Sequence, residues 1–243
     1  MILPQPKDAV HKAWLYRTLT TICDEPKLAS ALAFKGGTCA AMLGWLDRFS
    51  IDLDFDFRGS VTDLPEIKQL LETAFASIGL TIKDQSRHGL QYFLEYPAPR
   101  GDRNTLSIDA TFPPPRANTY ATLHLSDIDR IAVCQTKETM FANKLVAPLD
   151  RYRLRQSVAG RDIYDIHSFF LQGFGYNAAV IEERRQTSLG QFWQDLLAFL
   201  QTQVTEKILT EDLNLLLPPE KFRQIRKYLL PETMRLVKEQ GGK

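Results

Sequence analysis

Three carboxylates alternate with large apolar residues over positions 51–57, shortly after a pair of glycines. Successive side chains of a β-strand point to opposite faces, so Asp52, Asp54 and Asp56 would share one face. The other face, expected to be buried, would carry Ile51, Leu53, Phe55 and Phe57. Three like charges on one face repel one another unless a cation balances them. Because two hard oxygen ligands two residues apart suit Mg²⁺, the run predicts a metal site on a core strand.

The glycine pair belongs to the turn Gly36-Gly37-Thr38, which lies between an expected strand and an expected short helix over 40–46. Glycines allow a ligand to approach the backbone closely, and the N–H groups at a helix start favour phosphate. Thr38 is the expected N-cap of that helix. A glycine pair alone is usually only a structural turn. Followed by the aspartate strand, it favours phosphates held by the turn and Mg²⁺ held by the carboxylates.

A further carboxylate comes from 106–112, where apolar residues alternate around Asp109. If this strand lies beside the first, Asp109 points at the same metal site; otherwise it is a solvated aspartate on an edge strand. Asp56 lies a further ~6.6 Å along the strand from the Asp52 and Asp54 pair, by the rise per residue. We therefore place it outside the direct metal ligands and expect a salt bridge with Arg48 or Arg58.

The second half of the chain adds charged side chains to helical patterns. Lys144 lies among apolar residues in a predicted helix over 136–149 and could extend towards a triphosphate, although most such lysines are only solvated. Asp162 and Asp165 open the next helix, where carboxylates often just complement the helix dipole. Between these helices the sequence places candidate contacts for an RNA backbone, namely Arg151, Arg153 and Arg155.

The elements that must position these residues form an α+β protein. Strands over 80–83, 91–96 and 106–112 are separated by Gly and Pro, and helical patterns prevail after Gln135. We therefore expect a nucleotide-processing α+β domain with a small mixed sheet over 1–135. A helical C-terminal domain over 136–243 should follow and contribute to the active site.

Composition narrows the class of protein. The formal net charge is +1 over 243 residues, so the overall charge gives no sign of a nucleic-acid partner. Local basic patches can still bind one. The three cysteines form no CxxC pair, which argues against a zinc site and a disulfide scaffold and favours a reducing cytoplasm. No apolar run approaches the roughly 20 residues that span a bilayer. We expect a cytoplasmic protein with no membrane partner.

Taken in order, these motifs resemble the AbiEii/AbiGii toxin family of nucleotidyltransferases, within the DNA polymerase β-like superfamily. The resemblance rests on five segments: Lys35-Gly36-Gly37-Thr38, Arg48-Phe49-Ser50, Asp52-Leu53-Asp54-Phe55, Met140-Phe141 with Lys144-Leu145, and Arg161-Asp162-Ile163-Tyr164-Asp165. It implies a polymerase-β-like fold and a toxin whose antitoxin is encoded nearby, in a toxin–antitoxin or phage-defence system. Family members transfer nucleotides from an NTP, some of them onto tRNA.

The resemblance also implies roles for single residues. Asp52 and Asp54 would be metal ligands, Gly37 and Thr38 would lie at the nucleotide phosphates, and Lys144 and Asp162 would be further active-site residues. To these we add Gly36 and Ser50 for nucleotide binding and Asp109 as a third, catalytic ligand of Mg²⁺. Asp162 would orient Lys144 or the acceptor.

The leading hypothesis is Mg²⁺-dependent nucleotidyl transfer from an NTP to an RNA acceptor, with tRNA as the expected acceptor. Two alternatives stay open. A small-molecule nucleotidyltransferase, of the kind that modifies antibiotics, would need an acidic acceptor cleft for a cationic drug. A non-catalytic RNA- or protein-binding module on the same fold would have lost a carboxylate or the glycine turn.

Overall fold

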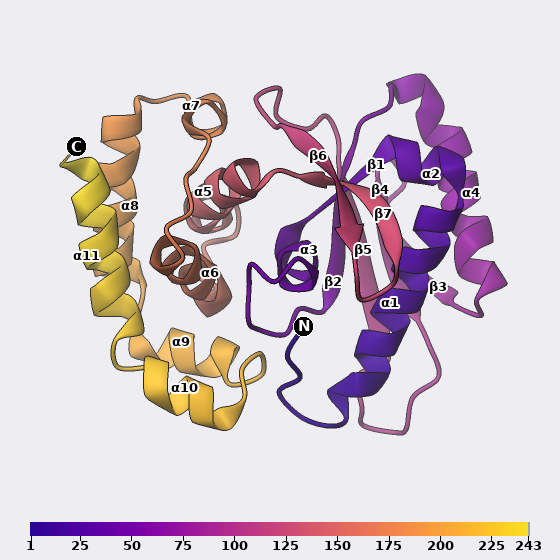
Figure 1. Ribbon diagram of the computed structural model, residues 1–243, viewed down its shortest axis with the longest axis horizontal. Coiled ribbons are helices and arrows are strands. Elements are labelled where there is room, and N and C mark those ends of the chain that lie inside the picture. Colours follow the sequence, from indigo (N-terminus) through magenta and orange to yellow (C-terminus); the bar gives the residue numbers. More distant parts are fainter. Residues whose placement is uncertain (243) are drawn as a thin grey trace. The chain divides into compact units, whose positions relative to one another are not determined.

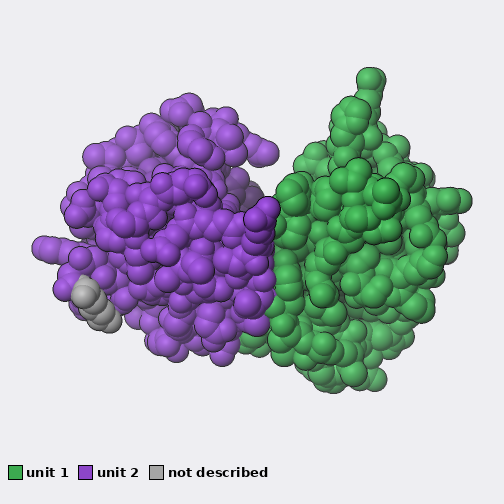
Figure 2. Space-filling view, turned by 90° about the horizontal axis from the view of Figure 1, so that it is seen from above, with its two compact units in different colours: residues 1, 3–114, 120–135 green, residues 2, 115–119, 136–243 purple. Residues whose placement is uncertain are grey.

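The structure is a computed structural model that describes residues 1–242, and Figure 1 shows its elements. The chain divides into two compact units, coloured separately in Figure 2. Unit 1 consists of residues 1, 3–114 and 120–135. Unit 2 consists of residue 2, the short segment 115–119 and the chain from residue 136 onward. The main division therefore falls between Gln135 and Thr136.

Unit 1 is built on one seven-stranded sheet with the order β3-β4-β5-β2-β1-β7-β6. Its strands are β1 (Leu32–Lys35), β2 (Asp52–Phe57), β3 (Thr81–Gln85), β4 (Leu90–Glu95), β5 (Thr105–Thr111), β6 (Tyr120–Leu125) and β7 (Arg130–Gln135). The pairs β2·β5 and β1·β7 are parallel, and the remaining neighbours are antiparallel. The sheet is therefore mixed, with β1, β2 and β5 side by side near its centre.

Alternation along the central strands sets the two faces of the sheet. Leu53, Phe55 and Phe57 of β2 are buried, as are the apolar residues of β5. The helices of unit 1 are α1 (Asp8–Asp24), α2 (Pro26–Ala31), α3 (Gly36–Met42) and α4 (Leu64–Ser77), with a 3₁₀ turn at Val61–Asp63. Helices α1, α2 and α4 pack on one another, and Figure 1 shows α3 on the other side of the sheet from them.

Unit 2 is helical. Its helices are α5 (Lys137–Arg155), α6 (Gly160–Leu171), α7 (Ala178–Arg185), α8 (Leu189–Gln203), α9 (Glu206–Leu213), α10 (Pro219–Ile225) and α11 (Leu229–Gly241). Side-chain oxygens of Thr136, Asn177, Ser188 and Thr205 cap four of these helices by accepting from backbone N–H groups of the first turn. No helix among residues 1–242 is long and apolar enough to cross a membrane.

The segment 115–119 is bonded to the helices of unit 2. The Glu183 carboxylate on α7 accepts from the backbone N–H groups of Arg116 and Ala117 at 2.8 and 2.7 Å. On α5, the Asn143 side-chain amide donates to Asn118 Oδ1 at 3.1 Å. These bonds explain why residues 115–119 belong to unit 2, although they connect β5 and β6 of unit 1.

The α+β fold with a mixed sheet and C-terminal helices is confirmed, with two local corrections. The helix expected over 40–46 begins at Gly36 and ends at Met42, and its N-cap is Lys35 rather than Thr38. The helix expected to end at residue 149 continues to Arg155 through Pro148. The three arginines expected between helices therefore lie on the last two turns of α5.

Candidate active site

Unit 1 brings the three predicted carboxylates onto adjacent strands. Asp52 and Asp54 lie on β2, and Asp109 lies on its parallel neighbour β5. In the register of these strands Asp54 is the direct partner of Asp109. All three side chains are only partly buried, whereas the apolar residues between them are buried. The three carboxylates therefore lie together on one face of the sheet, opposite the face that carries the buried apolar residues.

The first glycine of the turn lies directly against this group. A Cβ atom added to Gly36 would lie 2.3 Å from Asp54 Oδ2, and Gly36 has a positive φ of 79°. Both the close approach and the backbone conformation require glycine. The turn and the Asp54 carboxylate are thus in van der Waals contact, as a site that holds phosphates beside a metal requires.

The second glycine lies against Arg48 and Ser50. A Cβ atom added to Gly37 would lie 2.7 Å from Ser50 Oγ and 2.8 Å from Arg48 Nη2. Arg48 is 3% exposed and donates from Nη1 to the Phe49 carbonyl at 2.8 Å. Ser50 is therefore close to the turn, and its role in nucleotide binding stays a prediction. Arg48 was expected as a partner of Asp56 and as part of the family motif, but its buried position beside the glycine turn was not predicted.

Two hydrogen bonds fix the start of β2. The Thr38 hydroxyl, which is fully buried, donates to the Asp52 carbonyl at 2.5 Å. His11 of α1 donates from Nε2 to the Ile51 carbonyl at 2.9 Å. Burial lowers the pKa of His11 to about 4, so the ring is neutral at pH 7. The Thr38 hydroxyl is thus bonded to the protein backbone. A phosphate would therefore be bound by the backbone N–H of Thr38 rather than by its side chain.

Asp56 has a different environment from Asp52 and Asp54. It is fully buried, and its Oδ1 forms an ion pair with Lys35 Nζ at 2.7 Å. Its Oδ2 accepts from Tyr120 Oη at 2.9 Å and from Gln135 Nε2 at 2.7 Å. We expected Arg48 or Arg58 as its partner. The structure instead gives Lys35, because β1 runs antiparallel beside β2 and brings the lysine within reach of Asp56.

The donor set suits Mg²⁺, which prefers carboxylate oxygens and keeps several waters. Asp52, Asp54 and Asp109 are hard oxygen donors on neighbouring strands, beside a turn that begins with two glycines. Among residues 1–242, no group of three or more His, Cys, Asp or Glu side chains is placed so that it could hold a metal ion.

In unit 2, Lys144 is held by a different aspartate from the one predicted. Lys144 Nζ donates to Asp165 Oδ2 at 2.5 Å, and Asp165 is fully buried. Asp162 instead pairs with Arg151, whose Nε lies 2.9 Å from Asp162 Oδ2. Both aspartates lie in the first two turns of α6. The residue that orients Lys144 is thus Asp165, one helical turn after Asp162.

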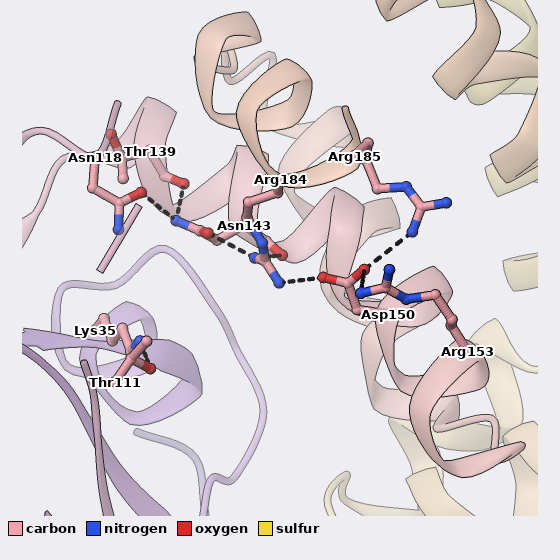
Figure 3. A network of polar contacts seen from close by, with 9 residues as sticks. All are labelled: Lys35, Thr111, Asn118, Thr139, Asn143, Asp150, Arg153, Arg184 and Arg185. Atoms are coloured by element: carbon pink, nitrogen blue, oxygen red, sulfur yellow. Dashed lines mark hydrogen bonds and ion pairs between the residues drawn. The ribbon is translucent and has the colours of Figure 1, made fainter. Parts of the chain in front are cut away.

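The arginines at the end of α5 differ in exposure. Arg151 is 26% exposed and engaged with Asp162, whereas Arg153 is 68% exposed. Arg155 is also exposed. Asp150 lies 3.9 Å from Arg153 and accepts from Arg184 and Arg185 at 2.7 and 3.0 Å (Figure 3). This end of α5 therefore carries more positive than negative charge and exposes part of it.

Known proteins are similar to this chain in fold more than in sequence. No curated protein matches the sequence. JHP933 from Helicobacter pylori has a similar structure, with 17% identity and a TM-score of 0.54 over 99% of this chain and 92% of that one. MenT4, a nucleotidyltransferase toxin from Mycobacterium tuberculosis, has 18% identity and a TM-score of 0.53 over 95% and 87%. At these identities the likeness shows the fold alone.

The family is shown by a sequence model described as the nucleotidyl transferase AbiEii toxin of type IV toxin–antitoxin systems, which matches residues 17–235. This range includes the glycine turn, the three carboxylates and the Lys144 and Asp162 segments. The chain therefore belongs to the AbiEii nucleotidyl transferase toxin family, and it is a nucleotidyltransferase.

Proposed function

We propose that the protein transfers a nucleotidyl group from an NTP to a hydroxyl of an RNA, with tRNA as the expected acceptor, and that the reaction needs Mg²⁺. The observation that carries the proposal is the register pair of Asp54 and Asp109, with Asp52 on the same strand and Gly36 against Asp54. This arrangement places carboxylates beside a turn that a triphosphate can approach closely.

In the proposed reaction the acceptor hydroxyl attacks the α-phosphorus, the bond to the β-phosphate breaks, and pyrophosphate leaves. Asp109 takes the hydroxyl proton or orients the hydroxyl. Mg²⁺ held by Asp52, Asp54 and Asp109 would neutralise charge that develops on the phosphates. Gly36, Gly37 and the Thr38 backbone would hold the triphosphate, with Ser50 beside them. Roles of Lys144 and Asp162 remain predictions from the family resemblance.

An RNA acceptor is supported by the charge at the end of α5. Arg153 and Arg155 are exposed there on a helix end with no acidic residue in its last turn, and exposed arginines favour a phosphate backbone. Arg151 stays a candidate contact, although it is already engaged with Asp162. Because the family is that of type IV toxins, we also propose a cognate antitoxin and a role in toxin–antitoxin function or phage defence.

Incubation of the full chain with each labelled NTP, Mg²⁺ and total RNA tests the proposal. Wild type should label RNA, chelation of Mg²⁺ should stop the labelling, and Asp54→Asn should lower it by at least about 100-fold. Asp84→Asn is the matched control, since Asp84 is an exposed carboxylate on β3 of the same sheet and should leave labelling unchanged.

Three outcomes would count against the proposal. Absence of labelled RNA with every NTP would exclude the RNA acceptors tested. Label that appears only on a small molecule would favour an antibiotic-type transferase. Equal labelling by wild type and Asp54→Asn would exclude the carboxylates as the site, even if transfer occurs.

A further inference from the structure

One lysine joins the three central strands of the sheet. Lys35 is the last residue of β1, and its Nζ lies 2.7 Å from Asp56 Oδ1 on β2. The same Nζ donates to the Thr111 hydroxyl on β5 at 2.6 Å (Figure 3). The order of these strands in the sheet is β1, β2, β5. The Lys35 side chain therefore extends from β1 across β2 and contacts β5.

The bonded residues hold a defined place in the register. Asp56 is the direct partner of Thr111, and Asp54 is the direct partner of Asp109, two residues earlier on both strands. Residues two apart on a strand share a face and lie ~6.6 Å apart. The ammonium group of Lys35 therefore joins β2 and β5 at the residue pair next to the candidate metal ligands, on the same face.

The chemistry of this junction favours a lysine. A fully buried carboxylate needs a charged partner as well as hydrogen bonds, and the other donors to Asp56 that have been described, Tyr120 and Gln135, are neutral. An ammonium group carries three donors, so it can pair with Asp56 and still donate to Thr111. Lys35 also directly precedes Gly36 in the sequence, so the residue that forms this junction is adjacent to the glycine turn.

We infer that Lys35 is a positioning residue that keeps Asp54 and Asp109 side by side by joining β2 to β5 through Asp56 and Thr111. The inference rests on the proposed function, because it assigns these carboxylates to the metal. Lys35 itself does not touch the nucleotide in this scheme. Asp56 serves as its anchor, which gives the third aspartate of the strand a role of its own.

Thr111→Val is the sharpest test, since it removes only the β5 end of the junction and keeps the ion pair. Thr105→Val is the matched control: it makes the same change on the same strand, where the hydroxyl donates only to Asn104 at 3.2 Å among the bonds described. Mn²⁺ affinity of the full chain is measured by titration. Amide hydrogen exchange of β2 and β5 is measured in parallel.

We expect Thr111→Val to weaken Mn²⁺ binding by about 2- to 10-fold, the value of one lost hydrogen bond. Exchange at the amides around Asp54 and Asp109 should accelerate by a similar factor. Thr105→Val should change neither. Lys35→Arg, which keeps the charge, should retain more Mn²⁺ affinity than Lys35→Met.

The outcomes separate the inference from the proposed function. If wild type binds Mn²⁺ and Thr111→Val binds it equally well, Lys35 is only a structural residue and the inference fails, whatever happens to the melting temperature. Unchanged exchange in Thr111→Val would overturn it as well. If wild type neither binds Mn²⁺ nor transfers a nucleotide, the proposed function fails and the positioning role fails with it.

Discussion

Replacement of Gly36 by alanine should separate the geometry of the carboxylates from the stability of the fold. The added Cβ would lie 2.3 Å from Asp54 Oδ2 and 2.9 Å from Asp54 Cβ and Cγ. Real Cβ atoms do not approach other atoms so closely, so either the turn or the carboxylate must move. We expect the Asp54 carboxylate to move, since Gly36 directly follows β1 and is the first residue of α3.

The magnitude follows from two separate costs. The φ of +79° at Gly36 makes any other residue unfavourable by about 1–2 kcal/mol. To reach an ordinary contact of 3.4 Å, the carboxylate oxygen must also retreat by about 1 Å, and a displacement of that size costs roughly 100-fold in rate. We therefore expect a modest loss of stability together with a large loss of nucleotidyl transfer.

Gly79 provides the control, because its φ is +83° and a Cβ atom there would meet nothing within 4 Å. Gly79→Ala should lose about 1–2 kcal/mol of unfolding free energy and retain full transfer activity. Urea denaturation and the RNA-labelling rate are measured for both variants. The reasoning is refuted if Gly36→Ala transfers nucleotides at the wild-type rate while it loses only as much stability as Gly79→Ala.

Other predictions concern buried charges. Lys35→Met leaves Asp56 buried without its ammonium partner and should cost about 3–5 kcal/mol of unfolding free energy, measured by urea denaturation; a loss below about 1 kcal/mol would contradict the ion pair. Asp165→Asn removes the charged partner of Lys144 and should cost about 1–3 kcal/mol, with a slower labelling rate; wild-type values of both would argue against the pair. The pKa of His11 is lowered to about 4 by burial, below its usual 6.5. The unfolded chain therefore takes up a proton between these values, and the free energy of unfolding should fall by up to roughly 3 kcal/mol as the pH drops from 6.5 to 4. Denaturation across this range should show the fall, and His11→Gln should flatten it; an equal slope in that variant would exclude His11 as the cause.

Local patterns were enough to predict the strands that carry the carboxylates. Residues 52–57 and 105–111 alternate strictly between apolar and other side chains, so both strands and their buried faces follow from the period of two. The pairing of Asp54 with Asp109 needed the further assumption that these strands are neighbours. The parallel β2·β5 ladder fulfils it.

Contacts between distant residues could not be predicted in the same way. Lys35 and Asp56 are 21 residues apart and meet only because β1 returns antiparallel beside β2. Lys144 selects Asp165 over Asp162 because of how α5 and α6 pack on each other, which the spacing of two aspartates on one helix does not reveal. Helix α5 passes through Pro148, where propensity alone predicts an end.

The five residues 115–119 limit how this protein can be divided or recombined. A gene cut after residue 135 would separate the helices of unit 2 from this segment, whose backbone N–H groups donate to Glu183 and whose Asn118 side chain accepts from Asn143. A chimera that takes its C-terminal half from another family member would need the matching five residues inserted between β5 and β6. Sequence variation in this short segment should therefore follow variation in α5 and α7, and the two halves should be inherited together rather than exchanged as independent cassettes.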